Sequence, residues 1–296
     1  NIVITGGSGF VGSYLCEKLI NDGHEIIVVD NLLTGSTENI NHLMHNENFS
    51  FIEHDVQNHI EIENKVDYVL HFASAASPKA YTEHPVNTLK AGSVGTINTL
   101  GLAKKHDAEY LLASTSEVYG DPLISPQTEE YWGNVNPNGE RSMYDEAKRF
   151  AEAAVATYSR SYDLKTKIVR IFNTYGPRMQ LNDGRVVTNF IVQALRNENI
   201  TIYGDGTQTR SFSYVEDTVA GIISLMNSTE YDVFNIGNPN EMTVGQLAEK
   251  IIKLTDSTSE IKYLELPNDD PKQRKPDITK AKTTLNWEPK VNLDEG

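Results

Sequence analysis

Short apolar runs and longer amphipathic stretches alternate along the first half of the chain. The apolar runs are nearly continuous, which is typical of parallel strands that are buried on both faces. They predict strands over residues 2–4, 25–29, 49–55, 67–73, 109–115 and 167–173. Helical periodicity predicts helices over residues 9–21, 87–105 and 144–162. The order of these elements indicates an α/β protein of the Rossmann type, with a doubly wound parallel sheet.

A glycine-rich turn follows the first strand and opens the first helix. Gly6, Gly9 and Gly12 let the chain turn tightly, bring backbone N–H groups against a pyrophosphate and pack the helix close to the sheet. The helix also directs the positive end of its dipole at the phosphates. The second strand ends at Asp30, whose carboxylate suits the hydroxyls of an adenosine ribose and repels a 2′-phosphate. The stretch therefore predicts a dinucleotide site that prefers NAD to NADP.

Further cofactor contacts are expected where the next strands end. Asp55 follows the third strand and is either an acceptor for the adenine amino group or a solvated acid at a strand end. Ser74 follows the fourth strand, where small side chains leave room for the middle of the cofactor. The predicted cofactor-binding residues are Gly6, Gly9, Phe10, Val11, Gly12, Asp30, Asn31, Thr34, Gly35, Asp55, Val56, Ser74, Tyr144 and Lys148.

Candidate catalytic side chains follow the fifth strand. Thr115, Ser116 and Glu117 come at its carboxyl end, where ligands bind in open α/β sheets. Tyr144 and Lys148 are four residues apart and share one face of the helix that follows. The ammonium group is expected to lower the phenol pKa from its usual value of about 10, so that Tyr144 serves as a base near neutral pH.

Three other features surround these candidates. Lys90 either reaches a substrate anion or is simply solvated. The proline-containing loop over residues 122–137 is long enough to be a functional cover over the site. Ser142 and Asp145 form a possible capping pair at the start of the helix that carries Tyr144.

Composition narrows the partners and the compartment. The formal charge of −15 argues against nucleic acids and anionic membranes as partners. Cys16 is the only cysteine and is expected on the packed side of the first helix, so no disulfide framework is possible and a reducing, cytoplasmic compartment is favoured. No apolar run reaches the roughly 18 residues that a membrane span needs. Because the chain begins at Asn1 already in a strand, we expect an upstream piece to be missing, and with it any targeting or anchoring segment.

Seven stretches of the chain match a known family. They cover residues 31–35, 114–122, 130–133, 144–149, 170–179, 183–187 and 269–277. Together they resemble the extended short-chain dehydrogenase/reductase family of nucleotide-sugar enzymes, over nearly the whole chain. The last stretch reads Asp-Asp-Pro-Lys-Gln-Arg-Lys-Pro-Asp and is most similar to the members that decarboxylate UDP-glucuronate.

The resemblance implies NAD-dependent conversion of UDP-glucuronate to UDP-xylose. Tyr144 would remove the proton of the C4 hydroxyl while Thr115 hydrogen-bonds that oxygen, and hydride would pass from C4 to NAD. The resulting C4 ketone makes the C5 carboxylate a β-keto acid, so CO2 leaves, C5 is protonated and C4 is reduced again. The cycle is redox-neutral, so NAD acts as a tightly held catalyst.

The resemblance also assigns roles to residues. The implied catalytic residues are Thr115, Glu117, Tyr144, Lys148 and Arg274. The candidate substrate-binding residues are Lys90, Ser116, Asn173, Arg185, Tyr203, Gln208, Arg210 and Arg274. Arg274 would grip either the sugar carboxylate or the diphosphate, because a guanidinium binds both bidentately. No metal ion is implied.

A domain division and an oligomeric state follow from the same resemblance. Residues 1–173 and 211–237 are expected to form the NAD-binding domain. Residues 174–210 and 238–296 are expected to form a smaller α/β region that binds the UDP-sugar. The helices over 87–105 and 144–162 would pair across a two-fold axis into a four-helix bundle, which predicts a homodimer.

Other outcomes remain open at this point. A 4,6-dehydratase of the family typically has an acid at the position of Ser116, which weakens that reading, and a 4-epimerase would oxidise and reduce C4 without losing carbon. Ala147 stands where the family usually has glycine, and residues 90–93 and 138–141 also depart from the pattern. These positions lie near the sugar and leave a 2-acetamido UDP-sugar possible as substrate. The last alternative is a non-catalytic NAD-binding protein, which would have no need of the tyrosine and lysine pair.

Overall fold

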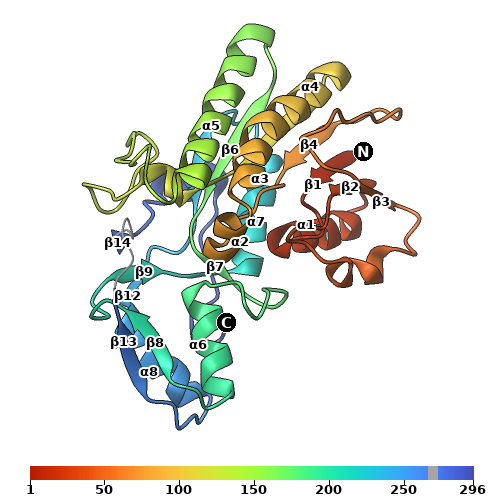
Figure 1. Ribbon diagram of the computed structural model, residues 1–296. Helices are drawn as coiled ribbons and strands as arrows, with labels where there is room; N and C mark the ends of the chain where they lie inside the picture. The colour runs from red at the N-terminus through yellow and green to blue at the C-terminus, as the bar shows by residue number, and fades with distance from the viewer. Residues whose placement is uncertain (266–272) are drawn as a thin grey trace.

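The central element of the fold is a parallel sheet of seven strands (Figure 1). The computed structural model describes residues 1–265 and 273–296. The strands are β1 (Ile2–Thr5), β2 (Ile26–Asp30), β3 (Phe49–Glu53), β4 (Tyr68–His71), β5 (Glu109–Thr115), β6 (Thr166–Ile171) and β11 (Val233–Ile236). Their order is β11-β6-β5-β4-β1-β2-β3, so the chain starts inside the sheet and winds first to one edge and then to the other. This confirms the predicted Rossmann-type, doubly wound sheet.

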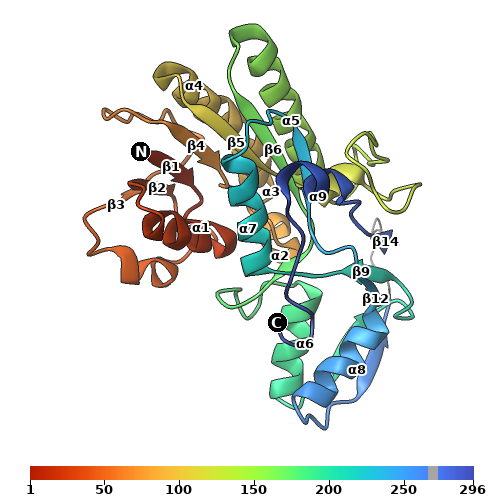
Figure 2. The same cartoon turned by 180° about the vertical axis from the view of Figure 1, so that it is seen from behind.

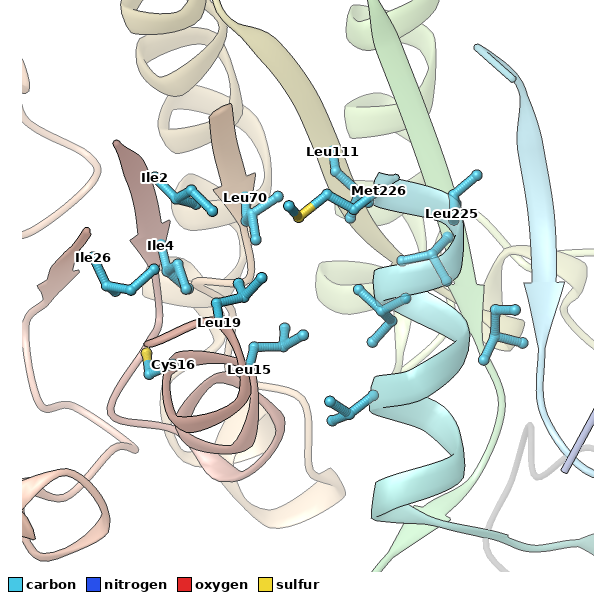
Figure 3. Close-up of a cluster of buried hydrophobic side chains, with 14 of the residues drawn as sticks. Ile2, Ile4, Leu15, Cys16, Leu19, Ile26, Leu70, Leu111, Leu225 and Met226 are labelled. Atoms are coloured by element: carbon cyan, nitrogen blue, oxygen red, sulfur yellow. The ribbon is translucent and has the colours of Figure 1, made fainter. Parts of the chain in front are cut away.

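Helices cover both faces of the sheet, and successive strand residues point to different layers. On the face seen in Figure 2 lie α1 (Phe10–Asn21), α7 (Val215–Met226) and α9 (Thr279–Leu285). Ile2 and Ile4 of β1 pack in this layer with Leu15 and Leu225 (Figure 3). On the opposite face lie α4 (Thr96–His106) and α5 (Ser142–Tyr162). Val3, between the two isoleucines, belongs to the core on that side, which explains why the strands have no polar face.

A second, smaller lobe lies below the sheet in Figure 1. It contains α6 (Val186–Leu195), β8 (Ile200–Tyr203), α8 (Val244–Leu254) and β13 (Ile261–Leu264). Beside them is a three-stranded sheet of β12 (Glu241–Thr243), β9 (Thr209–Ser211) and β14 (Gln273–Arg274). The lobe has its own apolar core, which includes Phe190, Ile202 and Leu247. Two short strands, β7 (Thr174–Tyr175) and β10 (Ser213–Tyr214), pair in parallel at the junction.

Three strands end earlier than predicted. β3, β4 and β6 stop at Glu53, His71 and Ile171, each two residues before the expected end. The residues that follow these strands turn out of the sheet and line a cavity. After β4 and β6 the apolar residues Phe72, Ala73 and Phe172 had suggested longer strands, but they belong to the wall of that cavity.

The helix predicted over 87–105 is interrupted. It consists of α3 (Pro85–Lys90), a π-helical turn over Ala91–Gly95 and then α4. Hydroxyl groups bond back to carbonyls one turn earlier in this segment, among them Thr96 to Gly92 at 2.8 Å. Such π-helical turns are frequent at functional sites. Within residues 1–265 and 273–296, no helix is both long and apolar enough to cross a membrane.

Two local predictions are wrong. Ser142 does not cap α5, because it is already the first helical residue, and no side chain caps this helix. The loop over 122–137 does not cover the cavity, since none of its residues lines it. It packs instead on the chain after β14, where Gln127 exchanges backbone hydrogen bonds of 2.8 Å with Lys275 and Asp277.

Candidate active site

A cavity of about 1080 Å³ opens where the carboxyl ends of the sheet strands meet the second lobe. Ligands bind at this edge of open α/β sheets, beside the point where the strand order reverses. Here that point lies between β1 and β4. All of the predicted site residues except Lys90 line this one cavity.

Lys90 is exposed and lies outside the lining of the cavity. Asn87, Thr88 and Ala91 of the same helical segment do line it. Thr88 is buried beside the cavity, whereas the side chain of Lys90 is exposed to solvent. The substrate contact considered for Lys90 is therefore not supported, and the solvated alternative describes it.

The glycine-rich turn forms one end of the cavity. Gly6 has φ +73°, and a Cβ there would lie 2.7 Å from the backbone nitrogen of Ala73. A Cβ on Gly12 would lie 2.2 Å from the carbonyl oxygen of Gly6, so both positions require glycine. No side-chain hydrogen bond caps the start of α1 at Gly9. The backbone N–H groups of the first turn therefore remain available to an anion such as a pyrophosphate.

Asp30 lies at the end of β2 beside this turn. Its carboxylate accepts hydrogen bonds from the backbone N–H groups of Ser8, at 3.0 Å, and Leu32, at 2.9 Å. Burial raises the pKa of Asp30, although these N–H groups partly offset the effect. Asn31 donates to Asp55 at 3.0 Å, which places both in the same wall. The glycine-rich turn therefore fits the pyrophosphate of a dinucleotide, and Asp30 fits its ribose.

Tyr144 and Lys148 are both buried in the floor of the cavity. The Lys148 Nζ donates to the carbonyl oxygen of Ala113 at 2.8 Å and lies 5.8 Å from the centre of the Tyr144 ring. The predicted fall in the pKa of Tyr144 is not found. Burial raises the pKa of this phenol, and the hydrogen bond with Thr115 offsets only part of the rise.

The buried ammonium of Lys148 has a consequence for stability. Burial lowers its pKa to about 8, and Glu152 offsets only part of this. An unfolded lysine keeps its proton up to about pH 10.4. Between these two values the unfolded chain binds a proton that the folded protein has lost, so the free energy of unfolding rises with pH. The cost of burying the charge is present in full below pH 8.

We expect this rise to reach about 3 kcal/mol at the upper end of the window. Lys148→Met should lack it, because the variant has no proton to lose. Urea unfolding of nucleotide-free protein, followed at pH values on either side of the window, measures the difference between the two proteins. If the free energy of unfolding depends on pH in the same way in wild type and variant, the rise does not come from Lys148.

Glu117 is held between two arginines. It forms ion pairs with Arg274, at 2.9 Å, and with Arg141. Arg274 is 1% exposed and also donates to the carbonyl oxygen of Gly120 at 2.6 Å. Burial alone would raise the pKa of Glu117, but Arg274 and Arg141 hold it below its usual range. Glu117 is therefore ionised, and both guanidinium groups reach it in this conformation.

Arg141 was not among the predicted site residues. It lies one helical turn before Tyr144 and lines the cavity. Its Nε is 4.0 Å from the carboxylate of Asp145, whose pKa is raised to about 7 by burial and by Glu117. Its spacing from Tyr144 was one sign, since residues three apart share a helix face, and the departure from the family pattern over residues 138–141 was another.

The second lobe contributes polar groups to the opposite wall. Arg185 makes a bidentate pair with Asp183, with Nε at 2.8 and 2.9 Å from the two carboxylate oxygens. Gln208 donates to the carbonyl oxygen of Tyr203 at 2.6 Å. Asn173 and Arg210 line the same region. These groups suit a nucleotide diphosphate and its base, and their individual roles stay predictions.

Comparison with known proteins identifies the family. Residues 3–296 match the family described as GDP-mannose 4,6 dehydratase. UDP-glucuronic acid decarboxylase 1 of Xenopus tropicalis is 54% identical over 295 residues, which cover 100% of this chain and 70% of that protein. The chain belongs to the UDP-glucuronic acid decarboxylase family. This confirms the resemblance that the sequence motifs predicted.

Solved structures place the decarboxylase family among related nucleotide-sugar enzymes. UDP-glucose 4-epimerase from Thermotoga maritima, solved with UDP-glucose, has a TM-score of 0.92 and 33% identity, covering 100% of this chain and 96% of that one. UDP-glucuronic acid 4-epimerase from Bacillus cereus, solved with UDP-glucuronic acid and NAD, has a TM-score of 0.89 and 27% identity, with the same coverage. Enzymes that catalyse different reactions therefore share this fold, and the reaction has to be argued from the residues of the site.

The structure describes Ala147, one of the positions that bear on the family resemblance, but not residues 269–272. Of the seven matching stretches, residues 269–272 of the last one lie outside the described residues. Ala147, at the position where the decarboxylase family usually has glycine, packs against the π-helical turn. A Cβ on Gly92 would lie 2.7 Å from the Cβ of Ala147, so the glycine opposite accommodates the alanine.

Proposed function

We propose that this protein decarboxylates UDP-glucuronate to UDP-xylose through a C4-keto intermediate, with NAD as a retained cofactor. The observation that carries the proposal is the arrangement at the end of β5. Tyr144 and Lys148 line the same cavity as Glu117, which two arginines hold in place. A sugar that is oxidised at C4 and carries a carboxylate at C5 needs the tyrosine and lysine pair for its C4 hydroxyl and an arginine for its carboxylate.

NAD is assigned to the end of the cavity that holds the glycine-rich turn. The uncapped N-terminus of α1 would bind its pyrophosphate, and Asp30 would bind the adenosine ribose. Similar structures that were solved with NAD support this choice. When bound, NAD accepts hydride from C4 and later returns it, so the overall reaction is redox-neutral.

The residues of the chain account for the proton and charge steps. Tyr144 takes the proton of the C4 hydroxyl, with Thr115 hydrogen-bonded to the same oxygen and Lys148 as the nearby cation. The C4 ketone allows the C5–carboxylate bond to break with loss of CO2, and C5 then takes up a proton. Arg274 and Glu117 lie at the position proposed for C5 and C6. Arg274 would hold the carboxylate.

The second lobe is proposed to bind the UDP moiety. We assign residues 1–173 and 211–237 to the NAD-binding domain and residues 174–210 and 238–296 to the nucleotide-sugar domain. The separate apolar core of the second lobe supports this division. Arg210, Gln208 and Tyr203 are the candidate contacts for the diphosphate and uracil.

Product analysis tests the function. The protein is incubated with UDP-glucuronate and NAD, and the nucleotide sugars are examined by mass spectrometry and chromatography. A product lighter by one CO2 is the expected result. An isomer of unchanged mass would instead indicate the 4-epimerase reaction, which the similarity to the Bacillus cereus enzyme keeps as the second candidate. If UDP-glucuronate stays unchanged, the proposed function is wrong for this substrate.

We propose a homodimer that forms through the helices on one face. Val86, Leu89 and Val94 of the α3 to α4 segment are 60%, 45% and 45% exposed, and Phe150 of α5 is 46% exposed. These apolar side chains belong to helical segments that pack together. Large exposed apolar patches of this kind mark interfaces.

We expect sedimentation of the wild type at micromolar concentration to show a dimer. Val94→Glu should give a monomer, because a buried unpaired carboxylate is unfavourable in an apolar interface. Leu254→Glu is the matched control, since Leu254 is an exposed leucine on α8 of the second lobe. A monomeric wild type, or equal effects of the two substitutions, would reject this interface.

We propose the cytoplasm as the compartment. Cys16, the single cysteine of the sequence, is buried in α1 as predicted and has no disulfide partner. A reducing compartment suits such a chain. Fractionation of cells that express the natural protein would test the assignment, and recovery from a secretory compartment would overturn it.

A further inference from the structure

Tyr81 is a cavity residue that the sequence did not single out. It belongs to α2 (Pro78–Glu83), whose first turn is capped by the Ser77 side chain, which accepts a hydrogen bond of 3.3 Å from the backbone of Ala80. The Tyr81 ring stacks on the Tyr144 ring, with 5.2 Å between the ring centres and 16° between the planes. Tyr81 is only 3% exposed, so the contact is buried.

The stack is separate from the two large cores of the sheet. Its apolar surroundings are Ala75, Ala80 and Met143, which with the two tyrosines make a small cluster of their own. Within this cluster Tyr81 is the residue whose ring lies against the Tyr144 ring. Offset or parallel contact between aromatic rings is favourable beyond the area that it buries.

Tyr81 also contacts the group that holds Glu117. The guanidinium carbon of Arg141 lies 5.8 Å from the centre of the Tyr81 ring, within the range of a cation–π contact. Arg141 in turn pairs with Glu117. A single side chain on α2 thus supports both the proposed base and the acidic residue at the site.

We propose that Tyr81 is a positioning residue, whose ring fixes the plane of the Tyr144 phenol and supports Arg141 against Glu117. The inference rests on the proposed function, in which Tyr144 takes the proton of the C4 hydroxyl. Burial raises the pKa of Tyr81, so its own hydroxyl stays protonated and its ring is the part that acts on Tyr144. A phenol displaced by about 1 Å loses on the order of 100-fold in rate.

Two substitutions separate the ring from the hydroxyl. Tyr81→Phe keeps the stack and Tyr81→Leu removes it. We expect Tyr81→Leu to lower kcat on the order of 10- to 100-fold, with little change in KM or NAD affinity. Tyr81→Phe should keep kcat within about 3-fold of wild type, since the ring remains. If Tyr81→Leu does not fold, Tyr81→Met fills the space without a flat ring, and the same fall is expected.

A stack of similar geometry provides the matched control. Tyr131 stacks on Tyr119 with 6.1 Å between ring centres and 17° between planes, and neither lines the cavity. Tyr131→Leu should leave kcat near wild type. Wild-type kcat in both Tyr81→Leu and Tyr81→Met, an effect on KM alone, or an equal loss in Tyr81→Phe would overturn the inference while the proposed function stands. No turnover in the wild type would overturn both.

Discussion

Replacing Tyr144 by phenylalanine is expected to lower turnover of UDP-glucuronate by about 10²- to 10⁴-fold, the usual contribution of a positioned base. The substitution removes the hydroxyl and leaves the ring, so the stack on Tyr81 is kept. NAD should stay bound, because its proposed contacts with Asp30 and the glycine-rich turn are not touched by the substitution. Steady-state rates and NAD binding, measured on the same preparation, check both expectations.

Tyr158→Phe is the control for this experiment. Tyr158 lies on the same helix, and its ring packs against Tyr162 outside the cavity. Its variant should turn over UDP-glucuronate at the wild-type rate. If Tyr144→Phe keeps most of its activity, or if both variants lose it equally, Tyr144 is not the base.

The pKa of Tyr144 refines how this base works. The sequence predicted a phenol pKa lowered by Lys148, whereas burial raises it in the structure. A neutral phenol cannot accept a proton, so the base in the proposed step is the small ionised fraction of Tyr144, which gains the proton of the C4 hydroxyl as hydride leaves C4. Thr115 and Lys148 are the neighbours in place to stabilise the charge that develops. Burial is the largest influence on this phenol and outweighs the hydrogen bond with Thr115, which acts in the opposite direction.

The sheet and most of the cavity could be predicted because they depend on local patterns. The strand over Glu109–Thr115 was predicted to the residue, since a continuous apolar run ends there in polar side chains. The spacing of Tyr144 and Lys148 on one helix face needed only the helical period. The glycine-rich turn likewise encodes its own conformation, as the positive φ of Gly6 shows.

The remaining features depend on tertiary contacts that no local pattern contains. Tyr81 reaches the site because α2 packs on the start of α5, which brings residues 63 positions apart into a stack. Lys90 lies outside the lining of the cavity for a similar reason, because the face that α3 turns to the cavity is set by packing. The ends of β4 and β6 were overestimated because small and apolar residues continue past them into the cavity wall.

Removing the guanidinium of Arg274 is the second change with a large expected effect. Arg274→Ala leaves Glu117 with one arginine fewer and the carbonyl oxygen of Gly120 without its 2.6 Å donor. Breaking a buried ion pair in this way costs about 3–5 kcal/mol of stability. We also expect kcat to fall by on the order of 100-fold, more than the affinity for UDP falls. The reason is that the sugar carboxylate loses its proposed partner.

Partial reactions locate the defect within the cycle. If Arg274 holds the carboxylate, oxidation at C4 should survive in Arg274→Ala while CO2 release slows. NADH absorbance would then build up during turnover, and the C4-keto sugar would be detectable by mass spectrometry. If Arg274 binds the diphosphate instead, KM for UDP-glucuronate should rise with little change in kcat, and the carboxylate role would be rejected.

Two further variants separate stability from chemistry. Arg170→Ala breaks a part-buried ion pair, in which Arg170 and Glu152 are 2.7 Å apart, and Arg170 does not line the cavity. It should lose stability without accumulating NADH. Arg274→Lys keeps the charge but not the bidentate fork, so it should restore part of the stability and little of the decarboxylation. Equal recovery of both would mean that Arg274 acts only by holding Glu117 in place.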